Sequence, residues 1–210
     1  MDENPYAAPA VELVDGAAAH SLEGWNASQL HVLGWLSLVS TFGTLVFLVM
    51  SLVGAALRMP DLETYGEWIG IAMVLLGNYL LIRFKGFAEA RFEARGLGIP
   101  VWTIVAVSLA MEAVVFGSGL EALDWRSITY LVLTGILGLL TLWFGIRLLK
   151  VQNVSPPFKV LAWLEIAVGP LLASVVLMMF AVIPALAAGV AMALVFFRGA
   201  AELEGLGEPR

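Results

Sequence analysis

The chain has 210 residues, of which 60% are apolar and only 13% are charged. A soluble globular domain carries about 45–50% apolar and about 25% charged residues, so this composition excludes an ordinary soluble domain and predicts an integral membrane protein. The absence of cysteine excludes disulfides, thiolate metal sites and thiol nucleophiles, and the net charge of −6 comes largely from the two ends of the chain.

Residues 1–27 are predicted to form a disordered, acidic tail on the cytoplasmic side. The first 25 residues contain no Lys or Arg, and they lack the apolar run that a secretory signal peptide requires. Asn26 and Gln29 then have the spacing of an N-cap residue and its capping-box partner. A helix is therefore expected to begin at this point.

Four apolar stretches follow, each long enough to cross a hydrocarbon layer of about 30 Å as a helix. They cover about 30–57, 66–84, 101–120 and 128–149. The stretch 160–197 contains one charged residue, Glu165, but as a single helix it would be about 57 Å long, which is too long for a bilayer. Because proline is favoured in a first helical turn, we divide this stretch at Pro184 into helices over about 160–181 and 184–198.

The basic residues determine the expected orientation. With six helices, Arg58 and Arg126 fall on one side of the membrane, and the other nine of the eleven basic residues fall on the opposite side: Arg83, Lys85, Arg91, Arg95, Arg147, Lys150, Lys159, Arg198 and Arg210. The positive-inside rule places these nine in the cytoplasm. The predicted fold is thus an all-α, polytopic transmembrane bundle over residues 28–198, with six helices in three hairpins. Both termini are expected in the cytoplasm, where residues 199–210 form a short tail.

The segment 84–95 continues the second predicted helix beyond the membrane. Its apolar residues Phe84, Phe87, Ala88 and Phe92 form one stripe, and Lys85 and Glu89 beside it form an i,i+4 pair. Such a segment could lie on the membrane surface with Gly86 as a bend. It could equally project as a straight extension and contact a partner, and the sequence leaves both alternatives open.

Glu112 is the main candidate for a functional residue. It is the twelfth residue of the predicted span 101–120, about 18 Å from the cytoplasmic edge, where lipid strongly disfavours a charged group. Ser108 lies one turn away on the same face, and four further hydroxyl residues fall at a similar depth: Thr41, Thr44, Thr134 and Ser174. These residues form a polar layer if their helix faces turn inward. The alternative is that a neutral Glu112 makes one interhelical hydrogen bond and only holds the bundle together.

Three other residues are secondary candidates. Glu165 lies near Lys159 in the sequence, so a salt bridge or snorkelling at the membrane interface would explain it. Pro170 is expected to kink the fifth helix, and broken helices with a nearby acid form ion sites in transporters. Asn78 is expected about 8 Å inside the cytoplasmic face, as an interhelical hydrogen-bond donor.

Other chemistry has no support in the sequence. It contains no nucleotide-binding loop, nucleophile elbow or zinc motif, no lysine inside a hydrophobic span and only two histidines. We therefore expect no catalytic residue, no cofactor and no metal site. The basic residues are not interleaved with aromatic ones for base stacking, so no nucleic-acid partner is expected either.

Two functional hypotheses follow. The first is a non-catalytic accessory, scaffold or protective protein that binds another membrane protein or a second copy, favoured by short loops and by a small-residue face at Ala181, Ala185, Gly189 and Ala193. The second is a small proton- or cation-coupled transporter or channel that uses Glu112 and the kink at Pro170. A transporter requires Glu112 to face a wet cavity, whereas a scaffold requires only one partner for it.

The N-terminal tail carries one resemblance. Residues 4–9, which read Asn-Pro-Tyr-Ala-Ala-Pro, resemble the start of many small, uncharacterised inner-membrane proteins of Gram-negative bacteria, including some of the RDD family. The Arg and Asp residues that define RDD helices are absent from every predicted helix interior. The resemblance thus implies a bacterial inner-membrane location and transfers no functional residue.

Overall fold

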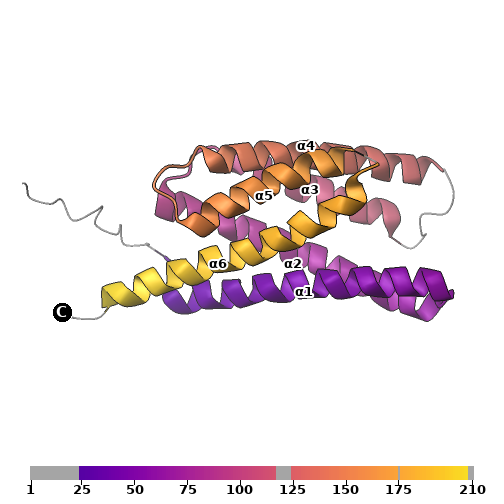
Figure 1. The fold of residues 1–210 in the computed structure, drawn as a ribbon, viewed down its shortest axis with the longest axis horizontal. Helices are drawn as coiled ribbons and strands as arrows, with labels where there is room; N and C mark the ends of the chain where they lie inside the picture. Colours follow the sequence, from indigo (N-terminus) through magenta and orange to yellow (C-terminus); the bar gives the residue numbers. More distant parts are fainter. Residues whose placement is uncertain (1–23, 117–123, 175, 208–210) are drawn as a thin grey trace, which may run out of the picture.

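The computed structural model describes residues 24–116, 124–174 and 176–207, and within these ranges it contains helices and no strand. Six helices are long and apolar enough to cross a membrane, which confirms the predicted all-α, multi-pass bundle. Their bounds are α1 Ala27–Leu57, α2 Pro60–Phe92, α3 Gly98–Val115, α4 Trp125–Leu149, α5 Pro156–Ala173 and α6 Val182–Gly207, with a short 3-10 helix η1 Met178–Ala181 before α6 (Figure 1). Most of the predicted N-terminal tail and the end of the third predicted span, 117–120, lie outside the described residues.

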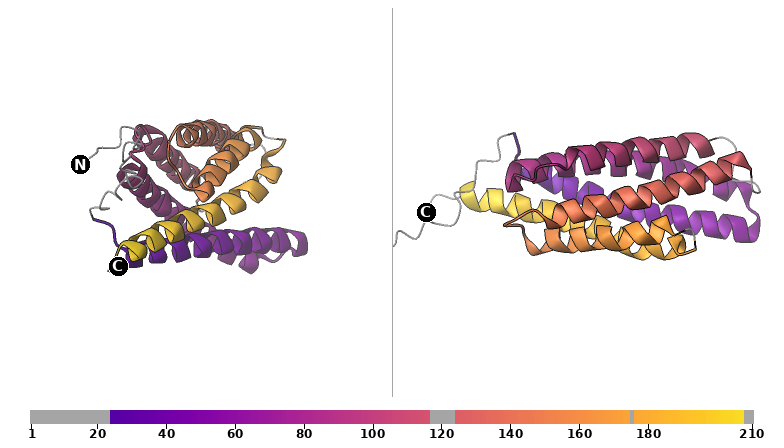
Figure 2. Two further views of the ribbon diagram at one scale, coloured as in Figure 1. Left: turned by 60° about the vertical axis from the view of Figure 1, so that its left-hand side comes forward. Right: turned by 90° about the horizontal axis from the view of Figure 1, so that it is seen from above.

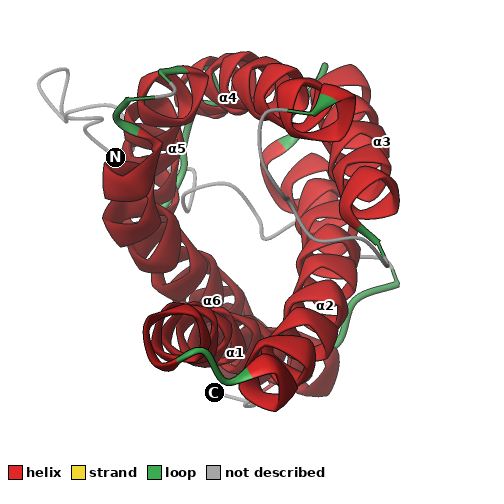
Figure 3. Cartoon of the chain, turned by 90° about the vertical axis from the view of Figure 1, so that its right-hand side faces the viewer, coloured by secondary structure: helices red, strands yellow, loops and turns green. Residues whose placement is uncertain are grey.

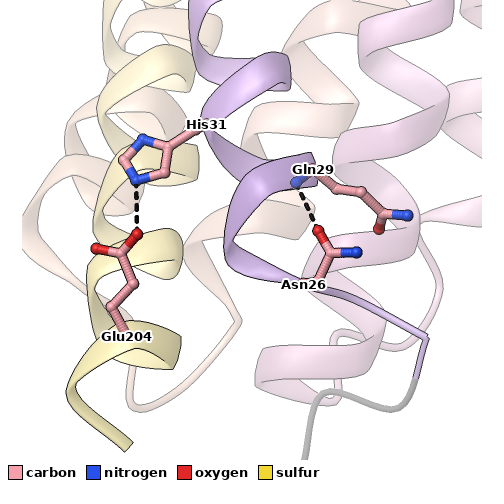
Figure 4. Close-up of polar contacts among 4 residues, drawn as sticks. All are labelled: Asn26, Gln29, His31 and Glu204. Carbon is pink, nitrogen blue, oxygen red and sulfur yellow. Dashed lines mark hydrogen bonds and ion pairs between the residues drawn. The ribbon is translucent and has the colours of Figure 1, made fainter. Parts of the chain in front are cut away.

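The helix starts follow local capping rules. Asn26 Oδ1 accepts a hydrogen bond of 2.7 Å from the backbone N–H of Gln29 (Figure 4), as the sequence predicts for the start of α1. Asp124 caps α4 in the same way, since its Oδ1 accepts a hydrogen bond of 2.8 Å from the N–H of Ser127. Each cap satisfies one of the backbone N–H groups that the first helical turn leaves without an intrahelical partner.

The six helices form a closed ring. Each helix packs on its neighbours in the sequence, and α6 packs back on α1. Viewed along the bundle, the helices surround a central region in the order α1 to α6 (Figure 3). This arrangement contains the three predicted hairpins and places residues from all six helices around one interior.

The start of α1 and the end of α6 lie at the same end of the bundle, where His31 Nε2 is 3.2 Å from Glu204 Oε1 (Figure 4). We call this the basic end, because the chain returns to it at the ends of α2, α4 and α6, which carry most of the basic residues. Arg58 and Arg126 lie at the opposite end. The last turns of α6 project beyond the other helices at the basic end (Figure 2), so residues 199–207, expected in a tail, are helical.

The predicted end of the fifth helix is wrong, whereas α6 begins within two residues of the start predicted at Pro184. The structure ends α5 at Ala173, not near 181, and Ser174 has an extended backbone conformation. Pro170 lies within the last turn of α5 and has no N–H for a helical hydrogen bond to Ile166, which weakens that turn. Pro184 is the third residue of α6, within the first turn as predicted, where a missing N–H costs nothing.

The segment 84–95 is straight, as in the second of the two predicted forms. The helix α2 continues to Phe92 without a break at Gly86, and Lys85 Nζ pairs with Glu89 Oε2 at 2.8 Å as expected. Phe84, Phe87 and Ala88, however, are fully buried inside the ring. The apolar stripe therefore packs within the bundle and not on a membrane surface or a partner.

Five buried phenylalanine rings close the interior at the basic end, and we call them the aromatic plug: Phe84, Phe87, Phe144, Phe158 and Phe196. Phe84 reaches across the ring from α2, with its centroid 6.4 Å from that of Phe144 on α4 and 6.1 Å from that of Phe196 on α6. The ring of Phe158 on α5 stacks on Phe84 at 5.6 Å. Four of the six helices thus meet at one point.

Candidate functional site

Away from the aromatic plug, the interior of the ring is hollow. The largest of its cavities, about 430 Å³, lies between α1, α2, α3 and α4. It is lined by apolar residues together with a set of polar side chains, so we call it the acidic cavity: Thr44, Ser51, Glu63, Glu67, Ser108, Glu112 and Tyr130. The carboxyl group of Glu112 is close enough to Glu67 and to Tyr130 to interact with both electrostatically.

The side chain of Glu112 therefore faces a cavity. Among the described residues, no side chain or backbone group makes a hydrogen bond or ion pair with its carboxyl group. A carboxyl group without a protein partner needs water, a proton or a bound cation in its place. This is the arrangement that separates the transport hypothesis from a purely structural role.

Glu165 also turns into the ring. It lines a second cavity of about 280 Å³, the central cavity, with Gly77, Ser108 and Thr141. The salt bridge suggested by the proximity of Lys159 in the sequence is not formed, since no cation in the described ranges lies within 4 Å of its carboxylate. Two acidic residues on different helices, α3 and α5, thus point to one interior.

A third cavity of about 330 Å³ lies along the seam between α1 and α6. It is lined by Ser37, Ser40, Thr41 and Thr44 of α1 and by Gly189 of α6, among others. The three cavities adjoin one another, because they share lining residues. Thr44 lines this cavity and the acidic cavity, Ser108 lines the acidic and central cavities, and Gly189 lines this cavity and the central one.

The predicted polar layer forms in part. Thr41, Thr44 and Ser108 line the cavities, whereas Thr134 is buried against its own helix and donates to the carbonyl of Tyr130 at 2.9 Å. Ser174 is the C-cap of α5 and its N–H bonds the carbonyl of Pro170. Asn78 is an interhelical partner as predicted, but it accepts: Ser108 Oγ donates to Asn78 Oδ1 at 2.9 Å.

Asn78 keeps an unused donor. Its Nδ2 is buried and has no hydrogen-bond partner among the described residues. A buried amide N–H₂ without an acceptor is unfavourable, and Ser108, which Asn78 holds, lies at the junction of the acidic and central cavities. The pair Asn78–Ser108 thus places a polar junction between the two carboxyl groups.

The sequence interpretation missed Glu67 and Tyr130. A signal for Glu67 existed, because Gly66 and Gly70 flank it on α2 and both pack against α1, Gly70 beside Phe47. These glycines place Glu67 next to a helix contact, although Trp68 between the same two glycines is exposed. Tyr130 had no comparable signal, because its inward direction depends on how α4 is rotated against α5.

The lining of all three cavities contains acidic, hydroxyl and apolar side chains and not one Lys, Arg or His. An ionised carboxyl group in this lining would therefore have no protein cation beside it. No group of three His, Asp or Glu residues in the described part of the chain is arranged to hold a metal ion. The arrangement suits protons, weakly coordinated monovalent cations or organic cations better than a tightly held divalent metal.

Small residues lie where neighbouring helices of the ring come into close contact. A Cβ at Gly138 of α4 would come within 2.6 Å of the carbonyl oxygen of Gly169 of α5, and Ser37 Oγ donates to the carbonyl of Gly189 at 2.8 Å. Ala181 and Ala193 of the predicted small-residue face are buried inside the bundle. These faces close the ring itself.

No family model matches the chain, and no curated protein and no solved structure matches it either.

Proposed function

We propose that this membrane protein binds a monovalent cation or a proton inside the helix ring and carries it across the membrane. The observation that carries the proposal is that Glu112 and Glu165 line adjoining cavities with no protein partner for either carboxyl group. A scaffold needs a partner for Glu112, and none of the described residues supplies one. The burial of Ala181 and Ala193, two of the four residues of the predicted small-residue face, weakens one reason for preferring the accessory role.

The charges define the roles of the residues. Glu67 and Glu112 share one cavity, and two carboxylates so placed repel each other unless a proton or cation lies between them. Binding there relieves the repulsion, and Glu165 offers the next acidic group toward the basic end. The pair Asn78–Ser108 lies between these two positions and could pass a cation or a water-borne proton from one cavity to the next.

The aromatic plug closes this route at the basic end, because Phe144 belongs both to the plug and to the lining of the central cavity. On this proposal the plug blocks the route toward the basic end, which the charge distribution predicts to be cytoplasmic. Transport requires a second state in which the plug opens.

Flux through the purified full-length chain in liposomes tests the proposal. With a pH gradient or a K⁺ or Na⁺ gradient imposed across the membrane, we expect faster dissipation than in protein-free liposomes. Glu112→Gln and Glu165→Gln keep the shape but cannot ionise, so each should reduce flux at least tenfold while the chain still folds. Glu112→Asp should restore part of it.

Glu204→Gln is the matched control, because Glu204 is exposed at the basic end and faces His31. It should leave flux unchanged. Flux equal to that of protein-free liposomes for every cation tested, with the protein shown to be folded and inserted, would remove the proposal and return the accessory role to first place.

A further inference from the structure

A second charged site lies outside the ring interior, at the basic end. A pocket of about 310 Å³ is formed where the link from α2 to α3 meets the end of α4, and we call it the basic pocket. Three cations line it, namely Arg95, Arg147 and Lys150, against one carboxylate, Glu93. Its net charge is therefore opposite to that of the interior cavities.

Two neighbouring cations at this end form ion pairs, whereas these three do not. Lys85 pairs with Glu89 at 2.8 Å, and Arg91 pairs with Glu202 at 3.0 Å. Arg95, Arg147 and Lys150 have no ion pair within the described ranges. Like charges gathered in one pocket repel one another, so an anion that enters the pocket is attracted by all three.

The backbone brings the three cations together. Gly96 has φ +82°, a left-handed conformation that turns the chain between α2 and α3, and a Cβ at this position would come 3.3 Å from Arg147 Nη1. Glycine thus allows the link to pass close to the guanidinium group. The following helix α3 begins at Gly98 with no side-chain cap at Leu97, and its first N–H groups add positive potential at this end.

The surroundings of the pocket are those of a lipid headgroup site. The guanidinium carbon of Arg147 lies 5.8 Å from the ring centroid of Trp143, one turn further into the membrane. Ile99 and Trp102 on α3 are 69% and 55% exposed, and Ile146 on α4 is 41% exposed. These apolar side chains lie within two turns of the cations along α3 and α4, on surfaces that face lipid.

We infer that the basic pocket binds the phosphate of an anionic phospholipid, with the acyl chains along the exposed faces of α3 and α4. Basic pockets between transmembrane helices bind anionic headgroups because each cation near the surface adds to the attraction, and arginine can hold phosphate through two N–H groups. The inference is independent of cation transport, since no residue of the basic pocket lines an interior cavity.

Native mass spectrometry of the full-length chain in mild detergent tests this site with three probes: a short-chain phosphatidylglycerol, the matching phosphatidylcholine and inorganic phosphate. We expect phosphatidylglycerol to bind first and more tightly than phosphatidylcholine. The double variant Arg95→Gln/Lys150→Gln replaces two exposed residues and should fold normally, and each cation removed should weaken phosphatidylglycerol binding by about fivefold. Arg147→Gln should have at least as large an effect.

Lys159→Gln is the control, because Lys159 is exposed at the same end but does not line the pocket. It should leave binding unchanged. Equal binding of the two lipids, or an equal loss in the Lys159→Gln variant, would overturn the inference. Displacement of phosphatidylglycerol by inorganic phosphate at the same concentration would show that the pocket serves a soluble anion and would overturn its assignment to lipid.

Discussion

At the basic end the interior of the ring is filled with phenylalanine rings, whereas toward the opposite end it contains cavities that are lined mainly by apolar side chains together with carboxyl and hydroxyl groups. The largest fully buried side chains, from Leu30 and Phe84 to Phe196, all lie in the basic half. The three interior cavities and the residues Glu67, Glu112 and Glu165 begin where this filling stops. The same six helices therefore enclose two different environments.

The difference follows from what can occupy each half. An apolar cavity of this size would stay dry and would forfeit its packing contacts, so the basic half is filled. A cavity with several polar groups can hold water, which replaces the missing protein contacts. The carboxyl and hydroxyl groups in its lining therefore allow the hollow half to hold water.

The largest expected effect concerns the filling itself. Phe84→Ala removes the ring that contacts Phe144, Phe158 and Phe196, and it should destabilise the protein by about 3–5 kcal/mol through lost contacts and a new cavity. Leu137→Ala is the comparison in the hollow half, because Leu137 already lines the acidic and central cavities. It should cost about 2 kcal/mol or less.

Unfolding in a denaturing detergent, followed by circular dichroism, measures both variants. Equal losses for Phe84→Ala and Leu137→Ala would mean that the two halves are packed alike, and the contrast between a filled and a hollow half would then be wrong.

In the hollow half, we expect stability to come from close contacts between neighbouring helices more than from buried side chains. Substitutions at two glycines of α4 test this expectation. Gly138→Ala places a Cβ 2.5 Å from the backbone nitrogen of Ala173 on α5, so the helices must separate, at a cost of about 1–3 kcal/mol. Gly135, nearly one turn away, has nothing within 4 Å of such a Cβ. Gly135→Ala should instead stabilise α4 by about 0.5–1 kcal/mol, because alanine restricts the unfolded chain. The same unfolding experiment applies, and a loss in both variants would show that the seam is not specific.

The sequence predicted the number and type of the helices, because a run of about twenty apolar residues has the length of a helix that crosses a bilayer. It was not sufficient for the break before α6. Leu171–Val182 is apolar throughout except for Ser174, so hydropathy gives no boundary there. At the end of α5, Gly169 packs against the backbone of Leu142 on α4, and hydropathy does not reveal such a contact.

The sequence predicted which residues of the candidate site lie at the same depth in the membrane. It did not predict which of them face the interior. Glu112, Ser108 and Thr44 were placed together because they lie at one level, but depth says nothing about how a helix is rotated. Glu165 illustrates the gap, because it faces the interior with its small neighbours Ala162 and Gly169, which pack toward α4. A small-residue stripe that includes an acid thus indicates an inward-facing acid more reliably than its distance from the nearest lysine does.

The smallest expected effect concerns the rim of the hollow half, where Asp124 caps α4. The pKa of Asp124 is lowered from its ordinary value, chiefly because its carboxylate accepts the backbone hydrogen bond of Ser127. A lowered pKa in the folded state means that the cap contributes its stabilisation above the pKa of the unfolded chain, about pH 4. This contribution decreases as the pH falls through the lower, folded value.

Asp124→Asn retains a side-chain oxygen for the cap but does not titrate. Its melting temperature in detergent should therefore decline less between pH 5 and pH 3 than that of the unmodified protein. Asp124→Ala, which removes the cap, should melt lower than the unmodified protein at neutral pH and should also show a weaker dependence on acid. Parallel acid profiles for all three proteins would mean that the rim of the hollow half is not held by this carboxylate.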